Sequence, residues 1–305
     1  MITLTKIREL DLSEASAPGR PMHLSAASGL VCLNAFMYVV ADDEIHLGVF
    51  PAAGSGPGQL IRLFEGTLPD SAKERKKHKP DLEGLVLLPS CERYPHGALL
   101  AVGSGSRRNR CLGAVLGLDA KGAASGPPHV VDLTPILAPL EEEFEALNIE
   151  GVVVSGETLR LLQRGNKRQS QNAIITFELS RFLDVLNTGS GSAIKPSAID
   201  LVDLGDIDGI PLCFTDGAGL PDGGTVFSAV AEDTDDPYND GRCAGAAVGI
   251  ADKDGRLCSL ERLDQPHKVE GLHAQADGDV IRLLLVSDAD DHTVPASLFA
   301  ATMRS

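Results

Sequence analysis

Aromatic side chains are scarce in this sequence. The 305 residues include no Trp, three Tyr and nine Phe, which together make up 4% of the chain. Sites that stack sugars or enclose quaternary ammonium groups depend on the flat faces of Trp and Tyr. The composition therefore argues against a sugar-stacking site and against an aromatic cage.

Long apolar runs and paired cysteines are missing as well. No stretch approaches the roughly 18 consecutive apolar residues that indicate a membrane-spanning helix. The opening residues, MITLTKIREL, contain no apolar core of a secretion signal. The six cysteines form no CxxC pair and show no metal-like spacing with histidine, so they predict reduced thiols. We therefore expect a cytoplasmic protein with no membrane partner.

Basic residues are fewer than acidic residues in this sequence. The chain has 27 Lys and Arg against 43 Asp and Glu, a formal net charge of −16 at pH 7. Such a charge disfavours nucleic acid and anionic membranes as main partners, whereas acidic clusters suit bound cations. Hydrophobic residues make up 43% of the chain, which is enough for a large core and excludes a disordered protein.

Five segments repeat one pattern, a short hairpin that opens with a polar residue followed by glycine. The opening pairs lie about 60 residues apart, which leaves room for two more apolar-rich strands in each unit. Four short strands per repeat, separated by Gly, Pro, Asp or Ser turns, predict a blade of a β-propeller. The pairs are Ser28-Gly29, Glu83-Gly84, Glu150-Gly151, Asp216-Gly217 and Glu270-Gly271.

The fifth unit is one strand short, because the chain ends soon after SLFAATMRS. The N-terminal segment LTKIRELDL resembles the fourth strands of other units and would complete the last blade. We therefore predict an all-β, five-bladed propeller of four-stranded blades in a single domain, residues 1–305, with six blades as the alternative. Helices are expected only as insertions at 139–147 and 180–187, and the basic run 73–79 is expected to be a loop.

The first strand of each propeller blade lines the central channel, so the residues that open the repeats should form a ring. Four potential carboxylates in one ring are unfavourable unless they are solvated, protonated or neutralised by a cation. Ca²⁺ prefers oxygen ligands. We expect Ca²⁺, or another divalent cation, to bind Glu83, Glu150, Asp216 and Glu270. Two other interpretations stay open: the glycines serve close packing at the channel, or the carboxylates perform acid–base chemistry.

Other candidate residues lie near the same face of the ring. Arg107, Arg108, Arg164 and Asn166 follow the second strands of two repeats and would bind an anionic substrate. His273 follows the fifth Glu-Gly pair and is a candidate general base, as is Glu150.

The Glu-Gly pair at the head of an inner strand resembles the gluconolactonase and paraoxonase-type propellers. The repeated EGL followed by a strand also resembles bacterial propellers related to esterase-like phytases. This resemblance implies a calcium ion near the channel, contacted by Glu83, Glu150 and Glu270.

Most other catalytic motifs are missing from the sequence. It contains no GxSxG elbow, no P-loop, no HExxH and no dinucleotide fingerprint after a strand. The ring of carboxylates and the basic residues near it instead lead us to predict a metal-assisted hydrolase that acts on a small anionic phosphoester, ester or lactone at the channel mouth. The alternative is a non-catalytic propeller scaffold that binds a metabolite or a protein partner.

Overall fold

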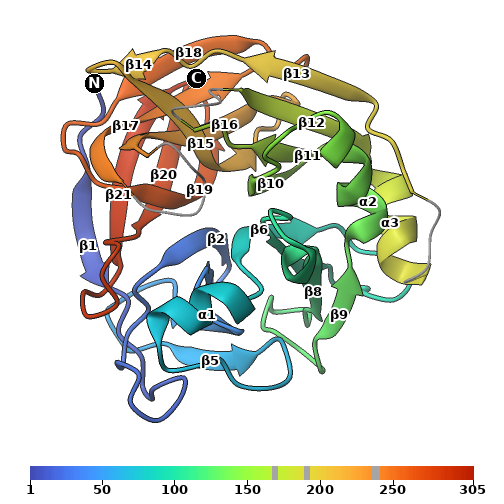
Figure 1. Cartoon of the computed structure of the whole chain (residues 1–305), viewed down its shortest axis with the longest axis vertical. Helices are drawn as coiled ribbons and strands as arrows, with labels where there is room; N and C mark the ends of the chain where they lie inside the picture. Colours follow the sequence, from blue (N-terminus) through green and yellow to red (C-terminus); the bar gives the residue numbers. More distant parts are fainter. Residues whose placement is uncertain (167–170, 189–192, 235–240) are drawn as a thin grey trace.

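The computed structural model describes residues 1–166, 171–188, 193–234 and 241–305. Its strands form five separate antiparallel sheets arranged in a ring around a central axis (Figure 1). The prediction of a five-bladed β-propeller is confirmed, and the six-bladed alternative is wrong.

Within each of the first three blades, the strands follow one another outward in chain order. Blade 1 contains β2 (Ala27–Leu33), β3 (Phe36–Ala41), β4 (His46–Pro51) and β5 (Gln59–Arg62). Blade 2 contains β6 (Leu82–Leu88), β7 (Ala98–Gly103), β8 (Leu112–Gly117) and β9 (His129–Asp132). Blade 3 contains β10 (Ile149–Ser155), β11 (Thr158–Gln163), β12 (Asn172–Glu178) and β13 (Ala198–Val202).

The last two blades vary this plan. Blade 4 contains β15 (Ile210–Gly219), β16 (Thr225–Asp233), β17 (Arg242–Ala251) and β18 (Leu257–Arg262), and the short β14 (Asp206–Ile207) pairs with β15. Blade 5 contains β19 (Val269–Asp277), β20 (Val280–Ser287), β21 (Ser297–Arg304) and β1 (Thr5–Glu9).

The N-terminal strand completes the ring as the sequence predicts. β1 pairs antiparallel with β21, with Lys6 opposite Phe299. Arg8 extends this link to blade 1, because its Nη2 donates to the carbonyl oxygen of Gly56 at 2.7 Å. The two ends of the chain are therefore joined in one blade, which holds blade 5 and blade 1 together.

The glycines of the repeat allow the inner strands to pack closely. A Cβ atom on Gly84 would lie 3.1 Å from the backbone nitrogen of Val152 in the next inner strand. A Cβ atom on Gly271 would lie 3.1 Å from the Cα atom of Gly29. Side chains rarely approach a backbone so closely, so glycine permits five inner strands to surround one narrow axis.

Apolar side chains fill the space between neighbouring blades. Phe214 and Phe227 of blade 4 meet edge to face, with ring centroids 4.8 Å apart. They belong to a cluster that also contains Leu162 and Ile174 of blade 3. This packing of sheet on sheet fixes the positions of the strand ends that surround the channel mouth.

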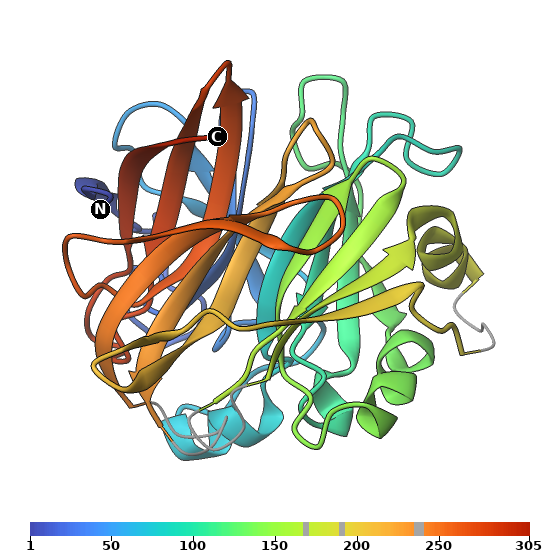
Figure 2. The same ribbon diagram turned by 90° about the horizontal axis from the view of Figure 1, so that it is seen from above.

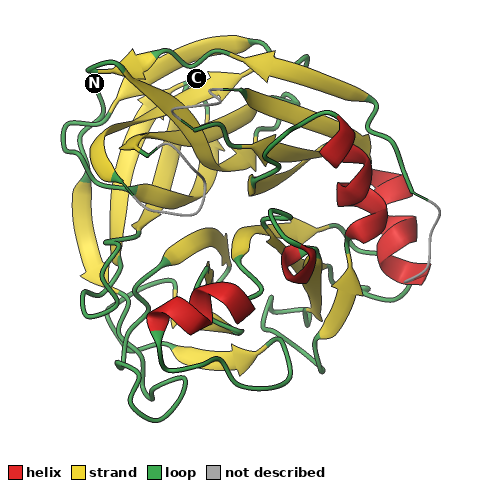
Figure 3. Cartoon of the chain, viewed as in Figure 1, coloured by secondary structure: helices red, strands yellow, loops and turns green. Residues whose placement is uncertain are grey.

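The helices lie outside the sheets (Figures 2 and 3). α1 (Ala72–His78) and α2 (Thr134–Leu137), which continues as a 3₁₀ turn over Ala138–Glu142, lie at one end of the ring, and α3 (Leu179–Thr188) lies on its outer side. In the described part of the chain, no helix has both the length and the apolar character needed to cross a membrane.

The predicted helices agree with the structure in part. The segment at 180–187 is helical as expected, within α3. The segment at 139–147 was placed too late, because the helical stretch begins at Thr134 with Pro135 in its first turn and ends at Glu142. The basic run expected as a loop is helix α1, in which Glu74 lies in the first turn and the basic residues lie in the last turn.

Candidate functional site

A β-bulge directs the polar residue of the repeat toward the channel. In blades 2 and 3 the strand register shifts between Leu82 and Gly84 and between Ile149 and Gly151. The first and fifth blades shift at the same place. A bulged residue leaves the ladder and its side chain is redirected. The four bulged residues line a cavity at the channel mouth; they are Ser28, Glu83, Glu150 and Glu270.

Blade 4 breaks this register. Its shift falls between Phe214 and Asp216, so Thr215 is the bulged residue and Asp216 stands at the glycine position. The Oδ2 atom of Asp216 accepts a hydrogen bond from the backbone of Leu272 at 2.8 Å, and Asp216 does not line the cavity. Burial raises the pKa of the Asp216 carboxyl well above its usual range. Asp216 therefore does not join the other three predicted ligands, Glu83, Glu150 and Glu270, at the cavity.

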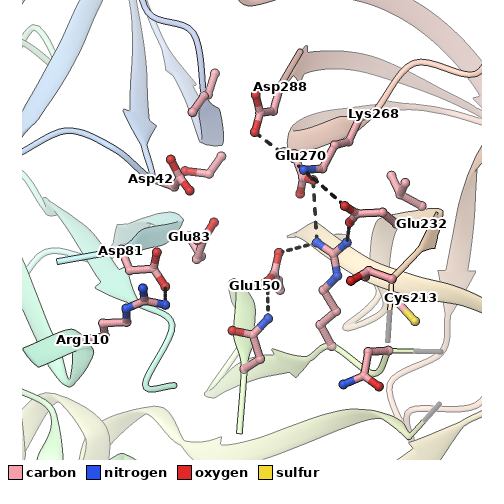
Figure 4. Close-up of a pocket in the computed structure, with 18 of the residues that line it drawn as sticks. Asp42, Asp81, Glu83, Arg110, Glu150, Cys213, Glu232, Lys268, Glu270 and Asp288 are labelled. Atoms are coloured by element: carbon pink, nitrogen blue, oxygen red, sulfur yellow. Dashed lines mark hydrogen bonds and ion pairs between the residues drawn. The ribbon is translucent and has the colours of Figure 1, made fainter. Parts of the chain in front are cut away.

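All five blades contribute to the cavity, which has a volume of about 800 Å³ including its open mouth. Three positions of the repeat supply most of its charged lining: the bulged residue, the residue two before it, and the residue at the end of the second strand (Figure 4). The residues two before the bulge are Ala26, Asp81, Asn148, Cys213 and Lys268. The residues at the ends of the second strands are Asp42, Arg164, Glu232 and Asp288.

Arg164 joins three carboxylates on one side of the cavity. Its Nη1 lies 2.9 Å from Glu150 Oε2 and 3.7 Å from Glu270 Oε1. Its Nη2 lies 2.5 Å from Glu232 Oε2. Glu150 is held further by Asn148, whose Nδ2 donates to its Oε1 at 2.5 Å. Because Arg164 is 12% exposed, solvent screens these pairs weakly. Arg164 therefore neutralises two of the predicted metal ligands.

Lys268 lies beside Arg164 and contacts several carboxylates more loosely. Its Nζ is 2.6 Å from Asp290 Oδ1 but 3.6 Å from Glu270 Oε1 and 3.7 Å from Asp288 Oδ2. Burial outweighs the attraction of Lys268 and raises the pKa of Glu270 to about 8. Burial likewise raises the pKa of Asp288 to about 7. This side of the cavity therefore holds protons near neutral pH.

Asp42, Asp81 and Glu83 gather on the opposite side of the cavity (Figure 4). One carboxylate oxygen of each lies within 4.8 Å of the other two. Asp81 Oδ2 accepts from Arg110 Nη1 at 2.7 Å, and Asp81 Oδ1 lies 2.7 Å from Lys79 Nζ. Lys79 Nζ also contacts Asp42. This group of three acids, named here the Asp42–Asp81–Glu83 cluster, has the donor atoms that hard cations prefer.

Glu83 differs from the other acids of the cavity. It makes no hydrogen bond and no ion pair with any residue in the described part of the chain. Burial, followed by the charges of Glu150 and Asp81, raises the pKa of Glu83 well above its ordinary value. The nearby charge of Lys79 opposes this shift without reversing it, so a bound cation would be needed to favour the ionised form of Glu83.

The structure separates the predicted substrate-binding residues. Arg164 and Asn166 line the cavity, whereas Arg107 and Arg108 are exposed to solvent and do not. The cation in that place is Arg110, which a 3₁₀ turn over Arg108–Arg110 directs inward. Arg110 was missed because the run of arginines gives no sign of which one is buried.

His273 is not brought to Glu150. It does not line the cavity, and its Nδ1 accepts a hydrogen bond from the backbone of Cys32 in blade 1 at 3.3 Å. Burial lowers the pKa of His273, which favours the neutral ring. The structure therefore gives His273 a contact between blades 5 and 1, and its predicted role as general base in the cavity does not fit this position.

The sequence analysis did not select three residues that line the cavity, although they share a position in the repeat. Asp81, Asn148 and Lys268 each stand two residues before a Glu-Gly pair. All three directly precede an inner strand, β6, β10 or β19, and line the same cavity. The repeat is therefore longer than the dipeptide and includes this earlier polar position.

Comparison with known proteins places the chain by sequence and by fold. The match to DUF6929, described as a family of unknown function, covers residues 23–303. The chain belongs to the DUF6929 family. A comparison with curated protein sequences finds no match.

Two solved structures illustrate how this DUF6929 protein resembles known propellers. A luciferin-regenerating enzyme has a TM-score of 0.50 and 10% sequence identity, over 99% of this chain and 95% of that chain. The WD40 domain of Neurospora crassa Pan2 has a TM-score of 0.42 and 7% identity, over 98% of this chain and 94% of that chain. At 10% identity, the likeness to the luciferin-regenerating enzyme concerns the fold alone.

Proposed function

We propose that this DUF6929 protein is a metal-assisted hydrolase whose active site is the cavity at the channel mouth. The observation that carries the proposal is Glu83. Lys79, Arg110, Arg164 and Lys268 each already contact a carboxylate in or beside this cavity, whereas Glu83 has no partner among the described residues. A divalent cation bound within ligand distance would stabilise the ionised form of Glu83, which the described residues favour only through the nearby charge of Lys79.

The cation site in this proposal is the Asp42–Asp81–Glu83 cluster. Three carboxylate oxygens suit Ca²⁺ or another hard divalent cation, with water and substrate supplying further ligands. A divalent cation there would polarise the substrate and activate water. Of the four ligands predicted from the sequence, Glu83 is retained here. Asp42 and Asp81 take the place of Glu150, Asp216 and Glu270.

Glu150 is the proposed acid–base residue. Asn148 and Arg164 fix its carboxylate from two directions, so its position is set before substrate binds. Burial raises the pKa of Glu150 although Arg164 opposes this shift. A carboxyl group whose pKa is raised in this way suits proton transfer near neutral pH. Arg164 is a positioning residue in this scheme.

The substrate in this proposal is a small phosphoester, ester or lactone with an anionic oxygen. That oxygen would bind the cation, and Asn166 lines the same cavity. The resemblance of the Glu-Gly motif to gluconolactonase and paraoxonase-type propellers supports the proposal, because a glutamate at this position holds calcium there. Glu83, Glu150 and Glu270 all stand at that position of the repeat, and we propose that Glu83 is the ligand because the other two pair with Arg164.

The test is hydrolysis of p-nitrophenyl phosphate, mono-p-nitrophenyl succinate and a lactone that carries a carboxylate, with Ca²⁺, Mg²⁺ or Mn²⁺ and with EDTA. We expect turnover of at least one substrate that requires the metal. Glu83→Gln should lower that turnover by about 100-fold or more, because it removes a direct metal ligand.

The matched control is Glu92→Gln, which removes an exposed carboxylate outside the cavity. It should leave turnover unchanged. Absence of turnover across all substrates and metals, with ion binding intact, would instead support the non-catalytic scaffold.

A further inference from the structure

Lys79 is a buried cation inside the Asp42–Asp81–Glu83 cluster. It is 4% exposed, and its Nζ contacts Asp42 and Asp81 together. The carboxylate oxygens of the cluster lie within 4.8 Å of one another, so a cation that contacts two of them lies close to the third. The ammonium group of Lys79 therefore occupies space that a metal ion would need.

A divalent cation and the ammonium group could not share these oxygens. Ca²⁺ binds carboxylate oxygens at about 2.3–2.6 Å, which would bring it within a few ångströms of Nζ. At that separation two positive charges repel strongly where solvent screening is weak. A bound divalent cation requires the Lys79 side chain to move.

The structure provides a place for the displaced side chain. Lys79 also lines a second cavity of about 620 Å³, including its open mouth, which adjoins the first. Asp288, Asp290 and Asp291 line the wall of that cavity contributed by blade 5. A rotation of the Lys79 side chain would thus move its ammonium group from one set of carboxylates toward another.

The backbone of Lys79 is held in place, so its side chain can move alone. Asn109 Nδ2 donates to the carbonyl oxygen of Lys79 at 3.1 Å and to that of Lys77 at 3.2 Å. Arg110 Nη2 donates to the carbonyl oxygen of Lys76 at 2.9 Å. These bonds fix the end of α1 against the loop that follows β7.

We propose that Lys79 is an internal counter-ion of the cation site, which a divalent metal displaces and which thereby sets the metal affinity of the cavity. This inference rests on the proposed cation site. It adds that the metal-free protein already carries a cation there, and that the basic run of α1 supplies it. A monovalent ion, with less charge to offer the cluster, would not displace Lys79.

The experiment is calorimetric titration of Ca²⁺ into the wild-type chain, Lys79→Met and Lys77→Met. Lys79→Met removes the competing charge, so it should bind Ca²⁺ about tenfold or more tightly than wild type. Lys77→Met removes an exposed lysine of the same helix, which pairs with Glu74, and should bind like wild type. If Lys79→Met is insoluble, Lys79→Gln, which keeps a hydrogen-bond donor, takes its place.

The outcomes separate this inference from the proposed function. If the Lys79 variant binds Ca²⁺ more tightly than wild type, the result supports both the cation site and the role of Lys79. This includes the case in which wild type binds too weakly to measure. Equal or weaker binding by the variant, with clear binding by wild type, overturns the role of Lys79 and leaves the cation site standing. No binding by either protein overturns the cation site and this inference with it.

Discussion

Glu83 and Glu150 occupy the same position of the repeat but have opposite surroundings. The difference lies in the residue that follows the second strand of each blade. In blade 3 that residue is Arg164, and in blade 2 it is Ser104; each donates its backbone N–H to the residue two before the bulge. Ser104 brings no charge, and its hydroxyl donates to Asp81. A single difference between repeats therefore leaves Glu83 without an ion-pair partner among the residues that the structure describes.

Sequence patterns identified the bulged acids but not the buried cations of the cavity. The Glu-Gly pairs mark Glu83, Glu150 and Glu270, because the dipeptide recurs at a regular spacing. Lys79 and Arg110, which pair with Asp42 and Asp81, lie in or near basic runs, where periodicity does not tell a buried cation from a solvated one. The register error at Asp216 has a related cause, since a bulge shifts a strand by one residue without any change in composition.

Removal of Arg164 should destabilise the fold strongly. Arg164→Gln would leave Glu150, Glu232 and Glu270 near one another without their shared cation. Loss of one partner from a buried ion pair costs about 3–5 kcal/mol. Urea denaturation should therefore show a loss of this size in the free energy of unfolding.

The control for Arg164 is Arg181→Gln on α3. Arg181 is 68% exposed and pairs with Glu178 within the same surface segment. Its loss should change the free energy of unfolding by less than about 1 kcal/mol. Equal effects of the two substitutions would show that the Arg164 network contributes no more than a surface pair.

The raised pKa of Glu270 predicts a stability that depends on pH. Its pKa rises from an ordinary value of 4.5 to about 8 in the folded protein, mainly through burial. The folded state therefore holds this proton more tightly than the unfolded state, and stability falls as pH rises between these two values. Gln cannot ionise, so Glu270→Gln should become more stable relative to wild type across this window.

Melting temperatures of wild type and Glu270→Gln at about pH 5 and about pH 8.5 test this sign. The variant should gain stability relative to wild type as pH rises, and its melting temperature should exceed that of wild type by more at the higher pH. The gain in the free energy of unfolding should reach up to a few kcal/mol, since one pKa unit corresponds to about 1.4 kcal/mol. Glu178→Gln, which removes an exposed carboxylate, controls for the loss of one charge. A difference that shrinks with pH would contradict the assignment.

At the scale of elements, the inner strands combine two devices. The bulge directs a side chain into the cavity, and the following glycine lets the strand approach its neighbour. The turns and the alternation of apolar residues predicted most strands, because these signals are local. The helical segment after β9 begins earlier than predicted. The prediction relied on the acidic residues near 141–145 and overlooked Pro135 and the apolar residues that the core buries.

The close packing of inner strands gives a direct prediction for Gly84. In Gly84→Ala the new methyl group would lie 2.9 Å from side-chain atoms of Val102 and Val152 and 3.1 Å from the Val152 backbone. Overpacking of this kind costs about 1–3 kcal/mol, so the melting temperature should drop clearly.

Gly56 is the matched control for Gly84. An added Cβ atom there would meet only the Pro51 side chain, at 3.7 Å. Gly56→Ala should change the free energy of unfolding by no more than about 0.5 kcal/mol. A Gly84→Ala protein as stable as Gly56→Ala would show that the repeated glycine does not serve strand packing.

At the scale of the whole molecule, the ring brings together residues from distant parts of the sequence. Asp42 and Asp288 line one cavity although they belong to the first and last blades. The repeat predicted the number of blades and the closure by the N-terminal strand, since both follow from counting strands. It could not predict which side chains meet at the mouth, because that depends on bulges and on residues outside the repeated dipeptide.

The fold by itself leaves the chemistry open, because propellers of this shape serve both as enzymes and as binding scaffolds. The distinguishing feature of this member is the distribution of charge in its cavity. The cations there contact carboxylates, and Glu83 has no such contact within the described chain. We therefore propose that Glu83, together with Asp42 and Asp81, forms a site for an added cation.

The most direct test is the metal content of the purified protein after equilibration with Ca²⁺, combined with thermal melting in Ca²⁺ and in EDTA. We predict about one ion per chain, a higher melting temperature with Ca²⁺, and loss of both effects in Glu83→Gln but not in Glu92→Gln. If wild type binds no ion and melts at the same temperature in Ca²⁺ and EDTA, the Asp42–Asp81–Glu83 cluster is not a metal site.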